Sequence, residues 1–258
     1  MEPQRLQAGH GWQWVKQGYA LFMKAPLLWM VILSICVVAA VALSAVPVVG
    51  EPLASLLMPV ILAGLMAGCH ALQEGEELEL AHLFSGFHRH TTQLVTLGGV
   101  GLVAQYLIFG LMMLVGGSAL VSILMSGQPM EDPEIIKQAI TGAGLAMLLG
   151  ATLFSVLVMA MQFAPMLVFF HGMAPLAAMK LSLRAFLHNV APMLVYGVTF
   201  IFLAVLASLP KMLGWLVLLP IVFTSIYATY CDIFPLVKEG SSTSIEGEIT
   251  KPDDQAHF

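Results

Sequence analysis

The sequence predicts an all-α, polytopic membrane protein in which six transmembrane helices form three helical hairpins. Hydrophobic residues make up 59% of the 258-residue chain and charged residues 10%, whereas soluble domains contain about 45–50% apolar and about 25% charged residues. The apolar residues lie in six runs that reach the roughly 20 residues needed to cross a bilayer. Runs such as residues 34–41 lack the alternating polarity of a transmembrane β-strand. A soluble protein, a disordered protein and a β-barrel are therefore excluded.

The predicted spans follow one another along almost the whole chain, at residues 27–49, 52–72, 94–125, 139–170, 191–209 and 213–237. The first apolar run begins only at Leu27 and is longer than the core of a cleavable signal peptide, so we expect it to remain as an anchor. The third and fourth runs exceed the necessary length, so each is expected to tilt, to project past the bilayer or to break locally. Five glycines favour a break in the third: Gly98, Gly99, Gly101, Gly116 and Gly117.

Three amphipathic stretches, residues 12–24, 78–87 and 176–188, each precede an odd-numbered span. In the first of them, apolar side chains recur every three or four residues at Trp12, Val15, Tyr19 and Phe22. Helices with such a stripe lie in the plane of the membrane interface. We therefore expect three cytoplasmic interfacial helices, the alternative being helices packed against the ends of the spans.

The same stretches indicate an internal repeat. Each unit consists of an amphipathic helix, an outward span and an inward span that carries one proline, namely Pro59, Pro165 or Pro220. Proline is common in membrane helices, so a single one would carry no weight. Three prolines in matching places favour three equivalent hairpins.

The distribution of positive charge predicts the orientation. With the N-terminus inside, the cytoplasmic side holds eight Lys and Arg residues, and the outside holds only Lys137 and Lys211. Because positive residues near a span resist translocation, both termini are expected in the cytoplasm. Residues 1–237 then form one transmembrane domain. Residues 238–258, which are rich in serine and acids, are expected to form a disordered cytoplasmic tail.

One group of polar residues is the predicted site. His70, His171 and Asp232 each follow the proline of an even-numbered span and lie near its inner end, with Cys69 and Cys231 beside them. Ionisable groups in spans are costly and often functional. We hypothesise that the three side chains converge, within about 10 Å, on an inner-leaflet pocket that takes a cation, a metal ion or a polar lipid head. The alternative is that each is satisfied by water at the interface.

Other patterns point to no defined chemistry. His82, His88 and His90 lie in an acidic loop, but their spacing matches no metal site that we can defend. The midplane residues are almost all apolar, with Gln105, Gln162 and the prolines as exceptions. The three cysteines lie in apolar sequence and predict no disulfide framework. The net charge of −5 and the absence of a basic stretch argue against a nucleic-acid partner. No nucleotide-binding, zinc-peptidase or serine-hydrolase motif is present.

Two functions remain open. The first is a non-enzymatic accessory or structural component, without a cofactor, that engages lipids, a membrane-protein partner or a second copy of the chain. The second is a small-molecule or ion transporter or channel, a class that usually places polar residues or broken helices near the midplane. The scarcity of polar residues at that depth favours the first.

The segments at residues 11–19, 26–29, 58–72 and 82–87 carry a resemblance to a known family. Through them the chain resembles an uncharacterised proteobacterial family of six-helix inner-membrane proteins. The resemblance implies a location in the bacterial inner membrane and supplies no activity or site. The general plan is also similar to the membrane domain of some glycerophosphodiester phosphodiesterases. That similarity concerns architecture alone, and their catalytic domain is missing here.

Overall fold

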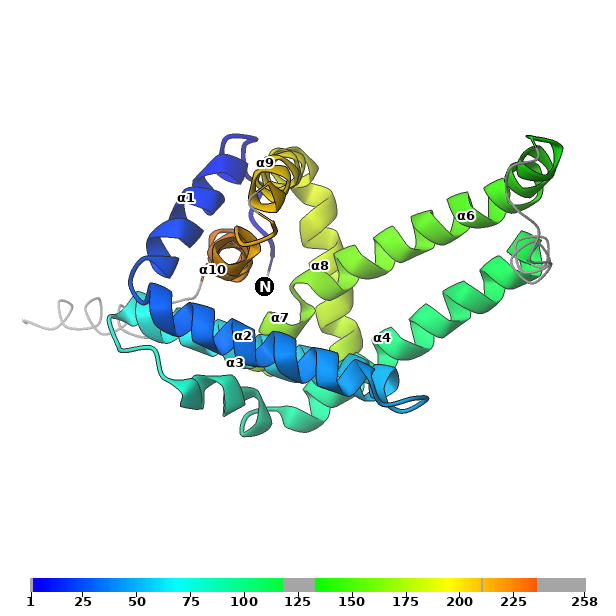
Figure 1. Cartoon of the computed structure of the whole chain (residues 1–258). Coiled ribbons are helices and arrows are strands. Elements are labelled where there is room, and N and C mark those ends of the chain that lie inside the picture. Colours follow the sequence, from blue (N-terminus) through cyan, green and yellow to red (C-terminus); the bar gives the residue numbers. More distant parts are fainter. Residues whose placement is uncertain (1, 118–132, 210, 236–258) are drawn as a thin grey trace, which may run out of the picture.

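The computed structural model describes residues 2–117, 133–209 and 211–235, and all regular elements within these ranges are helical (Figure 1). The elements are α1 (His10–Phe22), α2 (Pro26–Ser44), α3 (Gly50–Glu74), the 3-10 helix η1 (Leu80–Phe87), α4 (Thr91–Met112), the π-helical turn η2 (Met113–Gly117), α6 (Pro133–Gln162), α7 (Ala164–His171), α8 (Pro175–His188), α9 (Val190–Ser208) and α10 (Trp215–Ile233). The all-α prediction is confirmed. The tail predicted at residues 238–258 lies outside the described residues.

Six helical segments of the described chain are long and apolar enough to cross a membrane, as predicted: Pro26–Ser44, Gly50–Glu74, Thr91–Gly116, Ala143–His171, Val190–Ser208 and Trp215–Ile233. The third span stays helical through Gly98, Gly99 and Gly101 and departs from helical geometry only at Gly116. The fourth span is interrupted at Phe163, between α6 and α7. The interruption coincides with Pro165 in the first turn of α7, where a missing backbone N–H is tolerated.

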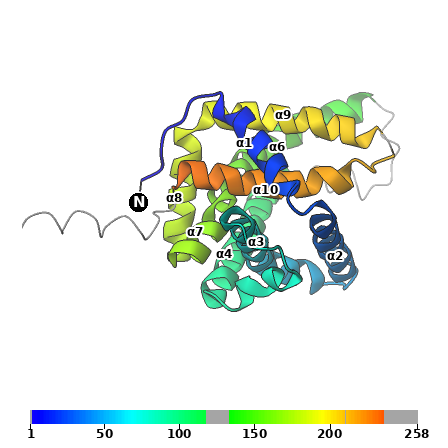
Figure 2. The same cartoon turned by 90° about the vertical axis from the view of Figure 1, so that its left-hand side faces the viewer.

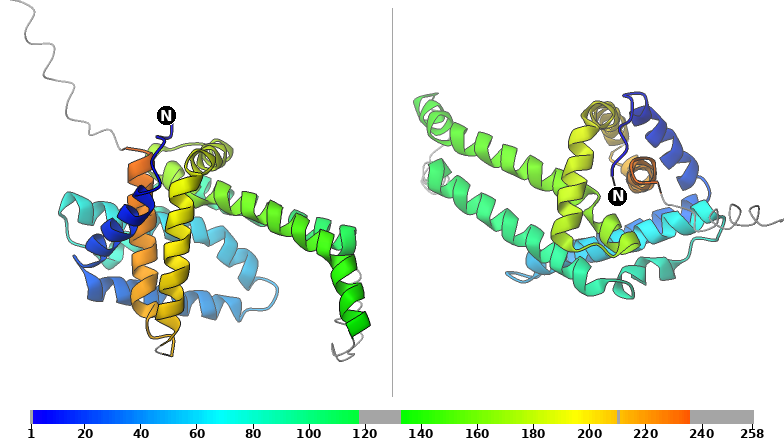
Figure 3. Two further views of the ribbon diagram at one scale, coloured as in Figure 1. Left: turned by 90° about the horizontal axis from the view of Figure 1, so that it is seen from above. Right: turned by 180° about the vertical axis from the view of Figure 1, so that it is seen from behind.

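The spans pair into three hairpins, α2–α3, α4–α6 and α9–α10, that project in different directions from a common base (Figures 1 and 3). In Figure 1 the α9–α10 hairpin is seen nearly end-on, whereas α4 and α6 run side by side away from the rest. We call α2, α4 and α9 the leading spans. The returning spans are α3, α6 with α7, and α10. Because the hairpins diverge, much of their apolar surface faces away from the protein, as a hydrocarbon environment allows.

The returning spans form the centre of the molecule. Buried residues make up 44% of the α3 span and 56% of the α10 span, but only 6% of the α4 span. Phe163 to Phe169, which join α6 to α7 and form most of α7, are also buried. The leading span α9 instead exposes large side chains such as Ile201 and Phe202. The fourth span is central only at this inner end, because as a whole it is 17% buried, the same share as in the leading spans α2 and α9.

The three amphipathic stretches are helical, and each packs across a returning span of another hairpin. Helix α1 packs on α10, η1 on α3, and α8 on α6 and α7. Figure 2 shows α1 crossing α9 and α10 obliquely. Each unit therefore contacts the next in a closed cycle, which is the packing order expected of a pseudo-threefold arrangement. That the three hairpins superpose with their prolines in register stays a prediction.

Small or hydroxyl-bearing residues make these crossings close. A Cβ atom added to Gly18 of α1 would lie 2.6 Å from the Cα of Ser225 in α10. The Thr224 hydroxyl of α10 donates a 2.8 Å hydrogen bond to the Gly18 carbonyl. At the crossing of α8, the Ser182 hydroxyl donates to the Met159 carbonyl at 2.8 Å and accepts from the backbone N–H of Phe163 at 3.0 Å. Ser182 thus satisfies the backbone at the break between α6 and α7.

Candidate functional site

Helix α10 divides the predicted polar group into two parts. The Nδ1 atom of His70 lies 2.9 Å from the Tyr227 hydroxyl, and Nδ1 of His171 lies 3.0 Å from the Tyr230 hydroxyl. Asp232 instead faces α1. A helix turns by about 100° per residue, so Tyr230 and Asp232 lie on nearly opposite faces. The hydrogen bonds therefore bring both histidines to one face of α10 and do not join Asp232 to either.

Aromatic rings fill the space between α3, α7 and α10 on the histidine side. The Phe170 ring stacks on Tyr230 with centroids 5.8 Å apart, and meets His70 edge-on at 5.5 Å. We call His70, Phe170, His171, Tyr227 and Tyr230 the aromatic layer. Tyr227, Tyr230 and Phe170 were not among the residues predicted from the sequence. Tyr227 and Tyr230 are three residues apart and therefore share one helix face, and this spacing could have indicated that they lie together.

The two cysteines of the predicted group lie beside the aromatic layer. Cys69 is fully buried, and Cys231 is partly buried with its Sγ atom 3.8 Å from Oε1 of Gln73. Both thiols are free. Within the described ranges, no group of three or more His, Cys, Asp or Glu residues is arranged to hold a metal ion.

Asp232 belongs to a separate cluster between α1 and α10. Its Oδ2 atom accepts a 2.7 Å hydrogen bond from the Trp14 indole and lies 2.8 Å from Nδ1 of His10. The adjacent N-terminal segment is held by the backbone N–H of Gln4, which donates to the Ile233 carbonyl at 3.0 Å. Asp232 thus lies beside a histidine, but this histidine is His10 and not His70 or His171.

In the acidic loop after α3, the histidine side chains contact residues close to them in the loop or beside it. Nδ1 of His82 accepts a 3.0 Å hydrogen bond from the backbone N–H of Glu79, where η1 begins. Nδ1 of His88 donates to the Phe84 carbonyl at 2.9 Å. His90 adopts a left-handed backbone conformation immediately before α4, and its ring lies beside Gly172. The three side chains therefore have separate local surroundings.

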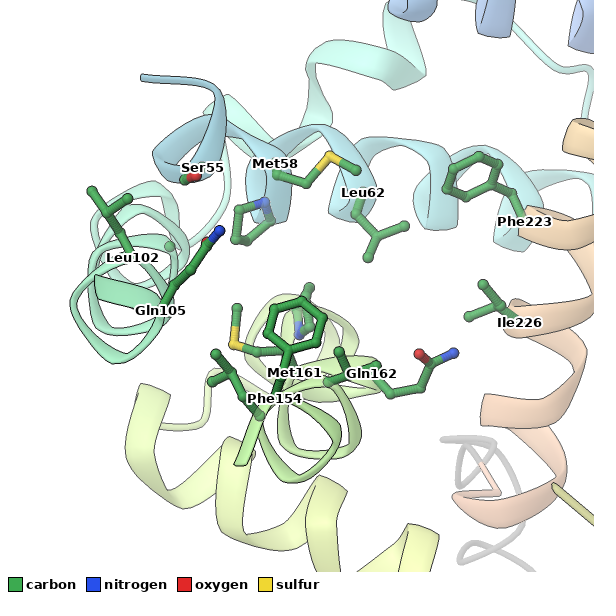
Figure 4. Close-up of a pocket in the computed structure, with 16 residues that line it drawn as sticks. Ser55, Met58, Leu62, Leu102, Gln105, Phe154, Met161, Gln162, Phe223 and Ile226 are labelled. Carbon is green, nitrogen blue, oxygen red and sulfur yellow. The ribbon is translucent and has the colours of Figure 1, made fainter. Parts of the chain in front are cut away.

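A pocket of about 330 Å³ lies deeper along the spans, between α3, α4, α6 and α10 (Figure 4). Most of its lining is apolar, and Met58, Leu62, Phe154 and Phe223 are among the larger side chains. Pro59 and Pro165, two of the three repeat prolines, also line it, as do the two midplane glutamines, Gln105 and Gln162. Most of the residues that interrupt the apolar midplane in the sequence therefore line this one pocket.

Glycines of α4 shape one wall of this pocket. A Cβ atom added to Gly98 would lie 2.7 Å from the carbonyl oxygens of Ser55 and Leu56, so only glycine allows α4 to approach α3 this closely. One turn further, a Cβ atom added to Gly101 would lie 3.1 Å from the Cε atom of Met161 and therefore point toward α6. The break after Gln162 ends α6 at the pocket.

Comparison with known proteins places the chain in a family. No family model matches the sequence, and no solved structure matches it. A protein of Burkholderia thailandensis named probable inner membrane protein is 30% identical, and the match covers 92% of this chain and 95% of the relative. The chain belongs to the family of this inner-membrane protein. The relative's name states a location and no activity, in agreement with the resemblance to an uncharacterised family.

Proposed function

We propose that this inner-membrane protein is a non-enzymatic accessory component that engages membrane lipids between its diverging hairpins. The observation that carries the proposal is the apolar pocket between α3, α4, α6 and α10. Met58 and Phe154 line the pocket and are 57% and 49% exposed, so it opens at the side of the protein, where lipid chains lie. A lipid chain fits such a lining because it buries apolar surface and carries no polar group that would itself need a partner.

The proposed orientation places both termini in the cytoplasm. Arg5, Lys16, Lys24, Arg89, Lys180 and Arg184 lie in or beside the amphipathic helices at the base, whereas Lys137 and Lys211 lie toward the hairpin tips. Positive residues favour the cytoplasmic side. The amphipathic helices would then lie at the inner-leaflet interface, close to the aromatic layer.

The non-enzymatic part of the proposal is supported by the pairing of polar groups. The ionisable side chains near the span ends are engaged by neighbours within the protein: His70 and His171 by tyrosines, and Asp232 by Trp14 and His10. Cys69, a potential nucleophile, is completely buried. These side chains stabilise the junction of the returning spans and leave little free for acid–base chemistry.

The experiment compares lipid retention in two glycine variants of α4. Gly101→Leu adds a side chain that points into the pocket, whereas Gly110→Leu adds one where no atom lies within 4 Å. Each variant is purified in a gentle detergent, and bound lipid is counted by native mass spectrometry. We expect Gly101→Leu to lose bound lipid and Gly110→Leu to retain the wild-type amount. Equal lipid content in all three proteins would overturn the proposal.

The alternative, a small-molecule or ion transporter or channel, is favoured by one observation: glutamines and prolines meet in this pocket. A solute flux in sealed proteoliposomes that Gly101→Leu abolishes and Gly110→Leu preserves would support the alternative over the accessory role.

A further inference from the structure

The two glutamines of the pocket lie along their spans, away from the base of the molecule. Gln105 lies 14 residues after Thr91, where α4 begins, which at 1.5 Å per residue is about 21 Å along the helix. Gln162 ends α6, and the eight residues of α7 that follow the break span about 12 Å. In a hydrocarbon core about 30 Å thick, both amides lie well away from the base where the phospholipid ester groups would be found.

Neither amide has a hydrogen-bond partner within the described ranges. The side-chain hydrogen bonds of the described residues include none from Gln105, which is exposed at the mouth of the pocket, or from Gln162, which is partly exposed. An amide without a partner in hydrocarbon costs several kcal/mol, because no water is present to replace the missing bond. A glutamine in such a pocket therefore favours a bound guest with a polar group, which can accept from its N–H donors or donate to its carbonyl oxygen.

The arrangement of the two side chains restricts what that group can be. Figure 4 shows Gln105 and Gln162 reaching into the pocket from different sides, with Phe154 and Met161 between their helices and Phe223 on the opposite wall. Two separated amides, whose N–H groups can each donate, in an apolar, partly aromatic pocket match a flat apolar molecule with two separated acceptors. The pocket volume of about 330 Å³ is of the size that holds a small ligand.

We infer that this pocket binds a lipid-soluble molecule whose ring carries two carbonyl acceptors, the chemistry of a quinone, with Gln105 and Gln162 each donating to one carbonyl. The apolar tail of such a molecule leaves the pocket past Met58 into the lipid between the hairpins. The inference deepens the proposed function and rests on it, because it names the class of lipid-soluble guest that the same pocket takes.

The test uses a short-tailed ubiquinone analogue and the full-length protein in nanodiscs made from quinone-free phospholipid. Binding is measured by competition against a photoreactive benzoquinone, with the cross-linked peptides identified by mass spectrometry. Cross-links are expected in the α4 and α6 peptides that contain Gln105 and Gln162. Gln105→Leu and Gln162→Leu should each weaken binding by about tenfold, since each removes one hydrogen bond. Thr96→Val, an exposed change on α4, is the matched control and should bind as the wild type does.

The outcomes separate this inference from the proposed function. Decylbenzene has the apolar tail and ring without carbonyls, and it should compete poorly. The inference fails if decylbenzene competes as well as the quinone analogue, or if both leucine variants bind the analogue as the wild type does. Either result would mean that the pocket holds hydrocarbon chains alone. The loss of lipid in Gly101→Leu would still support the proposed function. The leucine variants should also be at least as resistant to thermal unfolding as the wild type, because each removes an unpaired amide. A lower midpoint would assign the glutamines a structural role and overturn the inference.

Discussion

The indole of Trp14 donates a 2.7 Å hydrogen bond to the carboxylate of Asp232 and so joins α1 to the end of α10. Trp14 is completely buried, whereas Asp232 keeps 29% of its side chain exposed. The carboxylate can therefore stay hydrated on one side while it satisfies a buried donor on the other. This relationship explains how an acid is tolerated in the last span.

The first prediction concerns this bond. Asp232→Leu leaves the buried Trp14 N–H without an acceptor, so the free energy of unfolding should fall by about 1–3 kcal/mol. Asp232→Asn keeps a side-chain oxygen and should lose less. Thermal unfolding in detergent, followed by tryptophan fluorescence, measures both variants. An Asp232→Leu protein as stable as the wild type would show that the bond contributes nothing.

The crossing of α1 over α10 leads to the second prediction. Gly18→Ala places a methyl group against the backbone of Ser225, which cannot move aside as a flexible side chain would. We expect a loss of about 1–3 kcal/mol, the usual range for overpacking. Gly197→Ala in α9 is the matched control, since no atom lies within 4 Å of its Cβ position. The control should be neutral or slightly stabilising, because alanine favours helix over glycine. Equal unfolding midpoints for the two variants would contradict the close crossing.

A third prediction tests the aromatic layer. Tyr227→Phe removes the hydroxyl that bonds His70, and Tyr230→Phe removes the one that bonds His171. Each change should reduce stability by about 1 kcal/mol, the net contribution of a typical hydrogen bond. Tyr106→Phe, at a tyrosine of α4 that is 54% exposed, should have no effect. If all three variants unfold at the same temperature, the histidine–tyrosine pairs do not stabilise the junction.

The proposed orientation gives a fourth prediction. In a background without native cysteines, Val48→Cys places a thiol at the tip of the first hairpin, and Glu77→Cys places one in the loop after α3. A membrane-impermeant maleimide added to intact cells should label the first position alone, and cell lysis should expose the second. Labelling of Glu77→Cys in intact cells would reverse the orientation.

Hydropathy was sufficient to predict the six spans, and amphipathic spacing was sufficient to predict the helical stretch before each hairpin. Each of these features depends on residues close together in the sequence, so a local pattern carries the information. The excess length of the fourth run allowed a local break, but its position at Phe163 was not predicted, because the run continues through it without a change in hydropathy. The glycine-rich third run stays helical through Gly101, since its glycines allow close packing against α3 and Met161.

The candidate site was predicted in part. Proline spacing placed His70, His171 and Asp232 at similar depths, but depth does not specify the direction in which a side chain leaves its helix. Asp232 pairs with His10, which lies 222 residues away in the chain, so no local pattern could indicate the contact. Gln105 and Gln162 stood out as polar residues of the midplane, yet their meeting in one pocket depends on how α4 and α6 pack against α3 and α10.

The closed cycle of helix crossings has a consequence for biogenesis. Helix α1 packs on α10, which begins about 200 residues later in the chain. At a synthesis rate of about 5–20 residues per second, α1 waits roughly 10–40 s for its partner. During that interval the surface around Gly18 and Trp14 has nothing to cover it, while η1 and α8 can each dock on a span already made. The contact between α1 and α10 is thus the last of the three crossings to form during synthesis. This surface of α1 is where an insertase or chaperone would be needed longest.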